Sequence, residues 1–175
     1  MAYRAYPQWM SPRTTGDQRL ETVHFVRHAH AGDPLAWNGP DDLRPLSAKG
    51  RGQAERLGAF LVRAGIRPDR LISSPKVRAL QTAQAVGAAL HLKVVLDERL
   101  AGGCSIECLD QVLADSGARA PMLFGHDPDF TLLVSDLLGA REVTMRKGAL
   151  ASVDVRRPLR VGDGTLRWLI PPEIL

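Results

Sequence analysis

The sequence predicts an α/β protein with a mostly parallel central sheet and an antiparallel element near its C-terminal end. Short segments rich in β-branched and aromatic residues alternate along the chain with longer segments whose apolar residues recur at helical spacing. The last two apolar segments are instead separated by a stretch that contains Pro158, Gly162 and Gly164. This stretch favours two antiparallel strands joined by a turn.

Each predicted element rests on its own local pattern. Ser47, Ser74 and Asp127 stand where side chains that cap helix N-termini are expected, and Pro75 and Pro128 would occupy the first helical positions after two of them. The predicted strands are 22–27, 69–73, 93–96, 121–124, 150–155 and 165–170, and the predicted helices are 48–64, one from 75 to about 90, 105–115 and one from 128.

Length and composition indicate one globular domain. The chain has 175 residues, of which 45% are hydrophobic and 24% charged, enough for one well-formed core. Residues 1–20 contain aromatic residues, prolines and a glycine with no period, so we expect them to be an N-terminal extension that is partly disordered or lies on the surface. Residues 21–175 form the predicted single domain.

The same numbers argue against several classes of protein. The net charge of +4 is spread along the chain and aromatic residues are only 5%, so we expect no nucleic-acid binding. No apolar run approaches the ~18 residues that cross a membrane, and residues 1–20 lack the apolar core of a secretory signal. Cys104 and Cys108 have no partner ligands and no disulfide pattern. We therefore expect a cytoplasmic protein.

Charged and nucleophilic side chains follow three of the predicted parallel strands. Arg27 and His28 come after the first strand, Arg78 lies in the first turn of the helix after the second strand, and His126 follows the fourth strand. Parallel strands place their carboxyl ends at one edge of the sheet, so these side chains should meet there. A neutral imidazole is a nucleophile, guanidinium groups bind phosphate, and helix N-termini favour anions. The sequence thus predicts a phosphate site with a nucleophile.

The histidines near the first strand also permit a metal hypothesis. His24, His28 and His30 form an H-x-x-x-H-x-H pattern, but they straddle a strand and its exit and have no carboxylate at ligand spacing. We therefore expect no metal.

Several motifs, in this order, resemble the histidine phosphatase superfamily and its SixA-type phosphohistidine phosphatases. The resemblance runs from about residue 22 to residue 172, and the block S-P-x-x-R-A-x-Q-T-A is its most specific part. The motifs are Arg27-His28-Ala29, Arg44-Pro45-Leu46-Ser47, the block beginning at Ser74, Glu98-Arg99-Leu100 and Gly125-His126-Asp127-Pro128.

The resemblance implies a three-layer α/β/α sandwich of the phosphoglycerate mutase-like type and a covalent mechanism. His28 would accept the phosphoryl group, and Arg27, Arg78, His126 and Arg44 would hold its oxygens. No metal or cofactor would be needed, because the arginines supply the positive charge. The implied substrate is phosphohistidine on a protein.

The proton donor to the leaving group stays open. Larger members carry a glutamate near the third strand, and Glu98 stands at about that place, although the chain continues without their extended glutamate motif. Asp33 and Asp42, in the loop after His28, are further candidates. A phosphoramidate needs less acid assistance than a phosphate ester does.

Three alternative functions remain. The first is a general phosphatase of small phosphorylated molecules. The second is a mutase, but 175 residues leave little room for the insertions that cover a mutase pocket. The third is a phosphoprotein-binding module without activity, which would not need a nucleophilic histidine. The oligomeric state is open.

Overall fold

The structure, a computed structural model, describes residues 20–175 of the chain. The predicted extension lies outside the described residues, apart from Leu20. The six strands are β1 (Glu21–Arg27), β2 (Arg70–Ser73), β3 (Val94–Leu96), β4 (Pro121–Gly125), β5 (Leu150–Val155) and β6 (Thr165–Ile170). The four α-helices are α1 (Ala48–Ala64), α2 (Val77–Leu90), α3 (Ile106–Ser116) and α4 (Asp129–Leu138).

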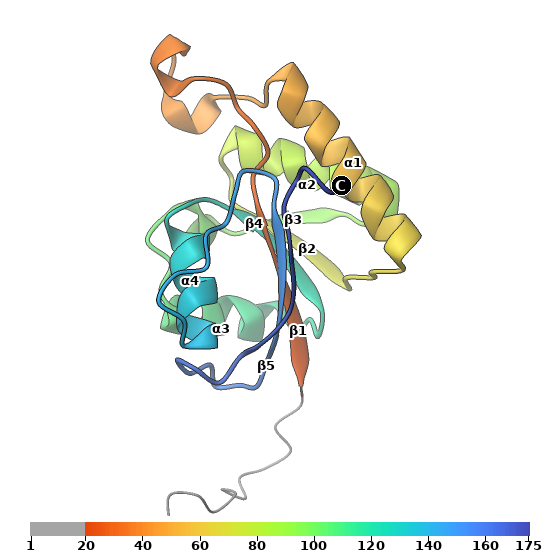
Figure 1. Cartoon of the computed structure of the whole chain (residues 1–175). Coiled ribbons are helices and arrows are strands. Elements are labelled where there is room, and N and C mark those ends of the chain that lie inside the picture. The colour runs from red at the N-terminus through yellow and green to blue at the C-terminus, as the bar shows by residue number, and fades with distance from the viewer. Residues whose placement is uncertain (1–19) are drawn as a thin grey trace, which may run out of the picture.

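The strands form one mixed sheet in the order β3-β2-β4-β1-β5-β6. The neighbours among β1 to β4 are parallel, while β5 and β6 are antiparallel to their neighbours. Helices α1 and α2 cover one face of the sheet and α3 and α4 cover the other (Figure 1). The predicted three-layer α/β/α sandwich with a C-terminal antiparallel element is therefore confirmed.

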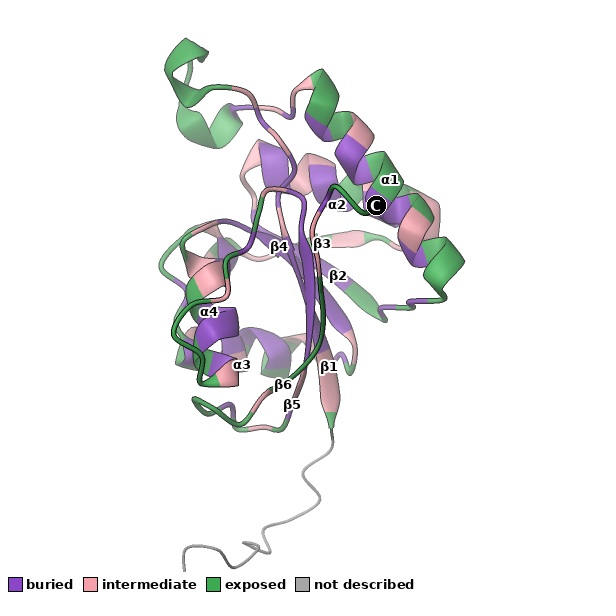
Figure 2. Cartoon of the chain, in the orientation of Figure 1, coloured by how far each residue is buried: buried purple, intermediate pink, exposed green. Residues whose placement is uncertain are grey.

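Alternation along the strands divides the core into two layers. In β1, Val23 and Phe25 pack with α3 and α4, whereas Val26 packs with Leu57 and Leu61 of α1. A strand residue faces the side opposite to its neighbours, so one apolar strand serves both layers. The buried residues accordingly lie along the sheet and the inner sides of the helices (Figure 2).

Helix α1 begins as the sequence predicts. Ser47 caps it by accepting a hydrogen bond from the amide of Gly50 at 3.1 Å. The amide of Ser47 in turn donates to the carbonyl of His30 at 3.0 Å. Gly50 has no side chain at the place where this carbonyl approaches the helix. The close contact fixes the path of the loop that leaves β1.

Two of the predicted helix starts are wrong. Helix α2 begins at Val77 rather than at Pro75, and helix α4 begins at Asp129 rather than at Pro128, neither with a side-chain cap. The physical reason is the same in both cases, because the expected capping side chain is bound elsewhere. The Ser74 hydroxyl contacts His126, and the Asp127 carboxylate pairs with Arg27.

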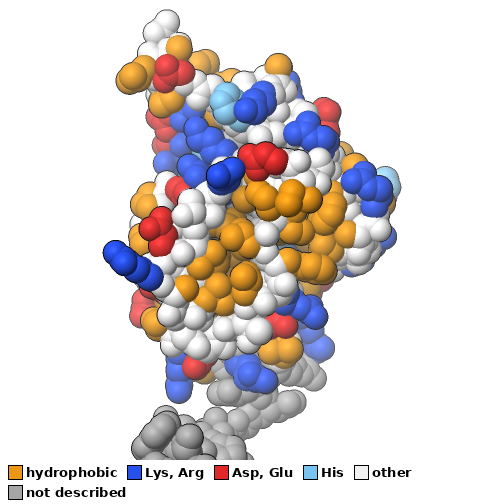
Figure 3. All heavy atoms as spheres, viewed as in Figure 1, with side chains coloured by type: hydrophobic (Ala, Val, Ile, Leu, Met, Phe, Trp, Pro, Cys, Tyr) orange, Lys and Arg blue, Asp and Glu red, His pale blue; other side chains and the backbone are white. Residues whose placement is uncertain are grey.

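Strand β6 is an exposed edge of the sheet. Leu166, Trp168 and Leu169 are each more than one-third exposed. Figure 3 shows hydrophobic side chains gathered on this face of the molecule, below a group of lysines and arginines. Among the described helices, none has the length and apolar composition needed to cross a membrane.

Candidate active site

The predicted site residues meet at the carboxyl ends of β1, β2 and β4. Arg27 and Gly125 are register partners in the parallel pair of β1 and β4, so His28 and His126, which follow them, lie side by side. Their ring centroids are 5.2 Å apart. Arg78, from the first turn of α2, directs its Nε–H to Nε2 of His28 at 3.3 Å. The sheet topology therefore assembles residues that are distant in sequence.

His28 is a buried, neutral imidazole with a defined tautomer. Its Nδ1 lies 2.7 Å from the carbonyl oxygen of Ala29, which can only accept, so the ring proton is on Nδ1. Nε2 therefore carries a lone pair and faces Arg78. Burial lowers the pKa of His28 to about 3, opposed by the Ala29 hydrogen bond and assisted by His126, Arg78 and Arg27. A ring in this state can act as a nucleophile at neutral pH.

His126 is also buried and neutral, with one nitrogen free of protein partners. Nε2 lies 2.8 Å from the Ser74 hydroxyl, which also accepts a hydrogen bond from the amide of Lys76 at 3.3 Å. Because the Ser74 oxygen already accepts from Lys76, its own proton is best used by donating to Nε2 of His126. The proton of the His126 ring is then on Nδ1. Burial, followed by the charges of Arg78 and Lys76, lowers the pKa of His126 to about 3.

Arg27 is held at one end of its guanidinium. Nη1 donates to the carbonyl of Met145 at 2.6 Å and pairs with the Asp127 carboxylate at 2.7 Å. The other oxygen of that carboxylate accepts a hydrogen bond from Thr131 at 3.0 Å. These contacts orient Arg27 without using its Nε.

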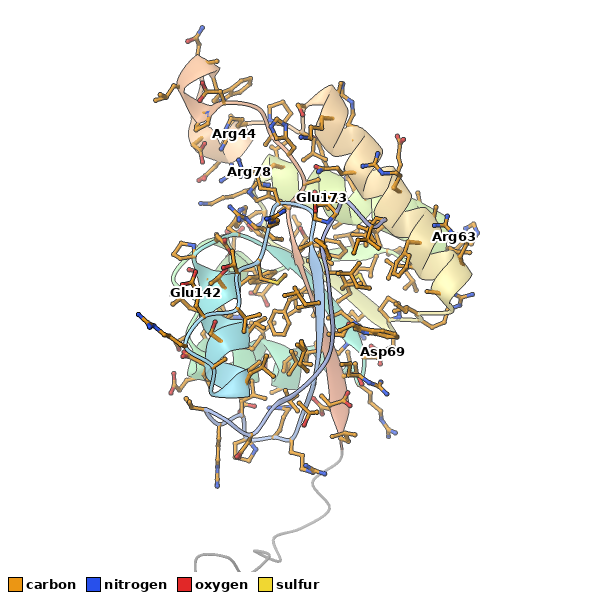
Figure 4. All side chains as sticks on the ribbon, viewed as in Figure 1. Arg44, Arg63, Asp69, Arg78, Glu142 and Glu173 are labelled. Atoms are coloured by element: carbon orange, nitrogen blue, oxygen red, sulfur yellow. The ribbon has the colours of Figure 1, made fainter. Side chains whose placement is uncertain are left out.

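Arg78 and Arg44 share the carboxylate of Asp41, in the 3₁₀ helix η3 (Asp41–Leu43). Arg78 Nη2 donates to Oδ2 at 2.9 Å, and Arg44 Nε donates to Oδ1 at 2.9 Å. The backbone carbonyl of Asp41 accepts a further hydrogen bond from Arg78 Nη1 at 2.7 Å. Both arginines lie at the same end of the molecule, beneath the loop that follows β1 (Figure 4).

Two buried donors at this site have no partner within the described protein. Among residues 20–175, the buried side-chain polar atoms without a hydrogen bond are Arg27 Nε, His126 Nδ1 and Glu21 Oε2. The first two flank His28, and both can donate. Buried donors without partners cost free energy unless a ligand accepts their hydrogen bonds. The arrangement can therefore bind an oxyanion next to a nucleophilic nitrogen.

Within the described residues, none of the three predicted proton donors forms a hydrogen bond with the His28 side chain. Glu98 is exposed, and within residues 20–175 its side chain forms no hydrogen bond or ion pair with a site residue. Asp33 is exposed and caps a short 3₁₀ helix by accepting from the Leu35 amide at 2.9 Å. Asp42 pairs with Lys76 at 3.1 Å.

Sequence reasoning did not assign Asp41 or Ser74 to the site. Asp41 lies beside Asp42 and three residues before Arg44, and the spacing of an aspartate and an arginine on a helical turn was the available signal. The sequence predicts a helix cap at Ser74, because serine is a common capping residue. A serine hydroxyl can equally well bind a histidine, and the sequence pattern does not distinguish the two roles.

The chain is similar to several known proteins. Residues 23–103 match the family model of the histidine phosphatase superfamily, branch 1. The chain is 28% identical over 156 residues to phosphohistidine phosphatase SixA of Escherichia coli, covering 86% of this chain and 93% of the relative. It is 38% identical over 82 residues to an 8-oxo-(d)GTP phosphatase of Mycolicibacterium smegmatis, covering 45% of this chain and 25% of the relative.

A solved structure gives the same result. The structure of the protein histidine phosphatase SixA complexed with tungstate superimposes with a TM-score of 0.76 at 25% identity, covering 87% of this chain and 98% of that one. The family model, the SixA relative and the similar solved structure point to one conclusion. The chain belongs to the histidine phosphatase superfamily, is SixA-like, and is a phosphatase.

Proposed function

We propose that this protein is a phosphohistidine phosphatase that acts on a phosphorylated protein through a phosphorylated His28. The supporting observation is the tautomer of His28. The Nδ1 proton is bound to the Ala29 carbonyl, and the Nε2 lone pair points to Arg78, in the region of the unpartnered donors of Arg27 and His126.

The first step is attack of His28 Nε2 on the phosphorus of the substrate. An N–P bond forms to Nε2, and the bond between phosphorus and the substrate nitrogen breaks, with its electron pair going to that nitrogen. Arg27 Nε, Arg78 and His126 Nδ1 donate to the phosphoryl oxygens, and Arg44 adds positive charge. Fixed donors of this kind stabilise charge without reorganising during the reaction.

In the second step water attacks the phosphorus, and the bond between phosphorus and Nε2 breaks with its electron pair going to Nε2. The protons of the water stay on the released phosphate or pass to solvent. Because Nδ1 keeps its proton, the ring departs as neutral imidazole rather than as an anion. The Ala29 carbonyl holds this proton in place in both steps. We propose that no metal is needed, because guanidinium groups supply the charge that metal ions supply in phosphoryl transfer by kinases.

The proposed substrate rests on two further facts. The similar proteins include SixA enzymes, whose names state a phosphohistidine substrate. The site also lies at the carboxyl ends of β1, β2 and β4, next to the exposed loop 33–43 (Figure 1), and an exposed loop there favours a substrate carried by another protein. A cytoplasmic location and residues 21–175 as a single domain stay predictions, as does an extension over residues 1–20.

A general phosphomonoesterase is the second candidate. A pocket of about 240 Å³ is lined in part by Arg44, one of the proposed phosphate-binding residues. Its walls include Asp33, Ala36, Trp37 and Leu46. A pocket in this position favours a small-molecule substrate with a bulky leaving group. The phosphohistidine hypothesis does not require such a pocket.

Phosphate release from a phosphohistidine-bearing protein and from phenyl phosphate, measured in parallel, tests the proposal. We expect faster turnover of the phosphohistidine protein, unchanged by EDTA, and an acid-labile phosphoenzyme in quenched reactions. His28→Ala should abolish both turnover and phosphoenzyme. His91→Asn is the matched control, since His91 is exposed at the end of α2 with a positive φ that asparagine accepts. Faster turnover of the ester would favour the second candidate, and full activity of His28→Ala would overturn the mechanism.

A further inference from the structure

We propose that Asp41 makes the enzyme selective for leaving groups that carry a proton and positive charge, as the ring of a phosphohistidine does. This inference rests on the proposed function and assigns the reaction a specificity-determining carboxylate. It follows from the position of Asp41 relative to the nucleophile.

A single guanidinium separates Asp41 from the nucleophile. Nε of Arg78 faces His28 Nε2 at 3.3 Å, while Nη1 and Nη2 at the far end of the same group bind Asp41 at 2.7 Å and 2.9 Å. The edge of the guanidinium that faces His28 stays available for phosphoryl oxygens. Asp41 thus lies at the end of the Arg78 guanidinium away from His28, where its side chain is exposed to solvent.

The carboxylate of Asp41 is charged and accessible. Each of its oxygens binds one arginine, and a carboxylate oxygen can accept more than one hydrogen bond. The side chain is 54% exposed, although Arg78 beside it is almost completely buried. The hydrogen bond from Arg44 is the main cause that lowers the pKa of Asp41, so the group stays anionic. It can therefore accept a hydrogen bond from a substrate.

An anion in this place distinguishes leaving groups by charge. The ring of a phosphohistidine bears the phosphoryl group on one nitrogen and can carry a proton on the other. With that proton present, the ring leaves as neutral imidazole and needs no proton donor. A hydrogen bond from the ring N–H to Asp41 favours this protonated form. Phenyl phosphate has no such proton, and its leaving oxygen becomes more negative near the carboxylate.

Asp42 provides a matched control within the same 3₁₀ helix. Its carboxylate pairs with Lys76 at 3.1 Å and contacts neither Arg44 nor Arg78 among the described interactions. Replacing either aspartate by asparagine removes one negative charge from the same exposed loop at almost constant volume. Only the change at Asp41 removes the charge next to Arg78.

The experiment measures kcat/KM for a phosphohistidine-bearing protein and for phenyl phosphate in wild type, Asp41→Asn and Asp42→Asn. Charged hydrogen bonds contribute about 10- to 100-fold. We expect Asp41→Asn to lower the ratio of the two values, phosphohistidine over ester, by at least about 10-fold. Asp42→Asn should leave this ratio within about 2-fold of wild type.

The ratio separates selectivity from a purely structural role. If Asp41 only orients Arg78, both substrates lose activity equally and the ratio is unchanged, which would overturn the inference. An equal fall of the ratio in Asp42→Asn would also overturn it, because loop charge in general would then be responsible. Failure of the proposed function itself looks different, since wild type would then form no phosphoenzyme on His28 and would release no phosphate from phosphohistidine.

Discussion

The Ala29 carbonyl oxygen lies 2.7 Å from Nδ1 of His28, the residue directly before it. This contact between chain neighbours determines which nitrogen of the ring holds the proton. Because β1 ends at Arg27, both residues of this contact lie in the loop that leaves the strand. The strand end thus supplies an imidazole of defined tautomer.

The first prediction concerns Arg78→Lys. A lysine offers a single ammonium, which cannot hold Asp41 and face His28 at the same time. Removing one preorganised donor to a transition state typically costs about 10²- to 10³-fold. We expect kcat/KM for phosphate release to fall by about this factor.

Arg157→Lys is the control for that substitution. Arg157 pairs with Asp110 at 2.8 Å, and neither residue belongs to the site. The kcat/KM of the Arg157→Lys variant should match that of wild type within error. Comparable losses in both variants would contradict a specific role for Arg78.

The second prediction concerns Ser74→Ala, which removes the partner of His126 Nε2. Without the hydroxyl, the ring is free to place its proton on Nε2, and Nδ1 then loses its ability to donate. Tungstate, an oxyanion, should bind about 10-fold more weakly, as expected for one hydrogen bond to a charged group. Isothermal titration calorimetry measures this affinity.

Ser116→Ala is a suitable comparison, since Ser116 lies at the end of α3, where its hydroxyl donates to the Leu113 carbonyl and accepts from the Ala118 amide. Tungstate affinity should be unchanged in this variant. An unchanged affinity in Ser74→Ala would show that Ser74 does not control His126.

The third prediction concerns acid stability. Burial lowers the pKa of His24 to about 4 and those of His28 and His126 to about 3, from an ordinary value of 6.5. Between pH 6.5 and these values the unfolded chain binds protons that the folded chain does not. The free energy of unfolding should therefore fall as pH decreases below 6.5, by up to about 1.4 kcal/mol per pH unit for each histidine.

Urea unfolding at pH 7.5, 6.0 and 5.0 measures this slope. His24→Gln removes one titrating group and keeps a polar side chain near Ser152, the partner of His24 at 2.7 Å. The slope of its unfolding free energy against pH should be smaller than that of wild type, by an amount equivalent to about one bound proton. Equal slopes would mean that His24 does not contribute.

The fourth prediction compares two glycines of α1. A methyl group at Gly50 would overlap the backbone carbonyl of His30, whereas at Gly52 the nearest atom is the flexible end of Arg56 at 3.5 Å. We expect Gly50→Ala to destabilise the fold by about 1–3 kcal/mol. Gly52→Ala should stabilise it by up to about 1 kcal/mol through helix propensity.

Thermal unfolding of both variants provides the measurement. Opposite shifts in Tm are expected, and activity should fall only in Gly50→Ala, because the overlap displaces the loop after β1. Equal shifts would contradict the proposed close contact.

The sequence by itself determined the layers of the fold and the main candidate residues of the site. Strand and helix periods follow from local residue patterns, and Arg27, His28 and His126 directly follow or end apolar strands. Parallel topology then requires these side chains to share an edge. That reasoning needs only the order of strands and helices along the chain, which can be read from the sequence.

Tertiary structure decided the partners of the charged side chains. Ser74 and Asp127 each had a plausible local role as helix caps, but contacts with His126 and Arg27 hold them instead. The path of an exposed loop decides that Asp41, and not its neighbour Asp42, binds Arg78. No periodic sequence pattern encodes that path. Local propensities differ by less than the free energy of a buried charged hydrogen bond, so long-range contacts prevail over them.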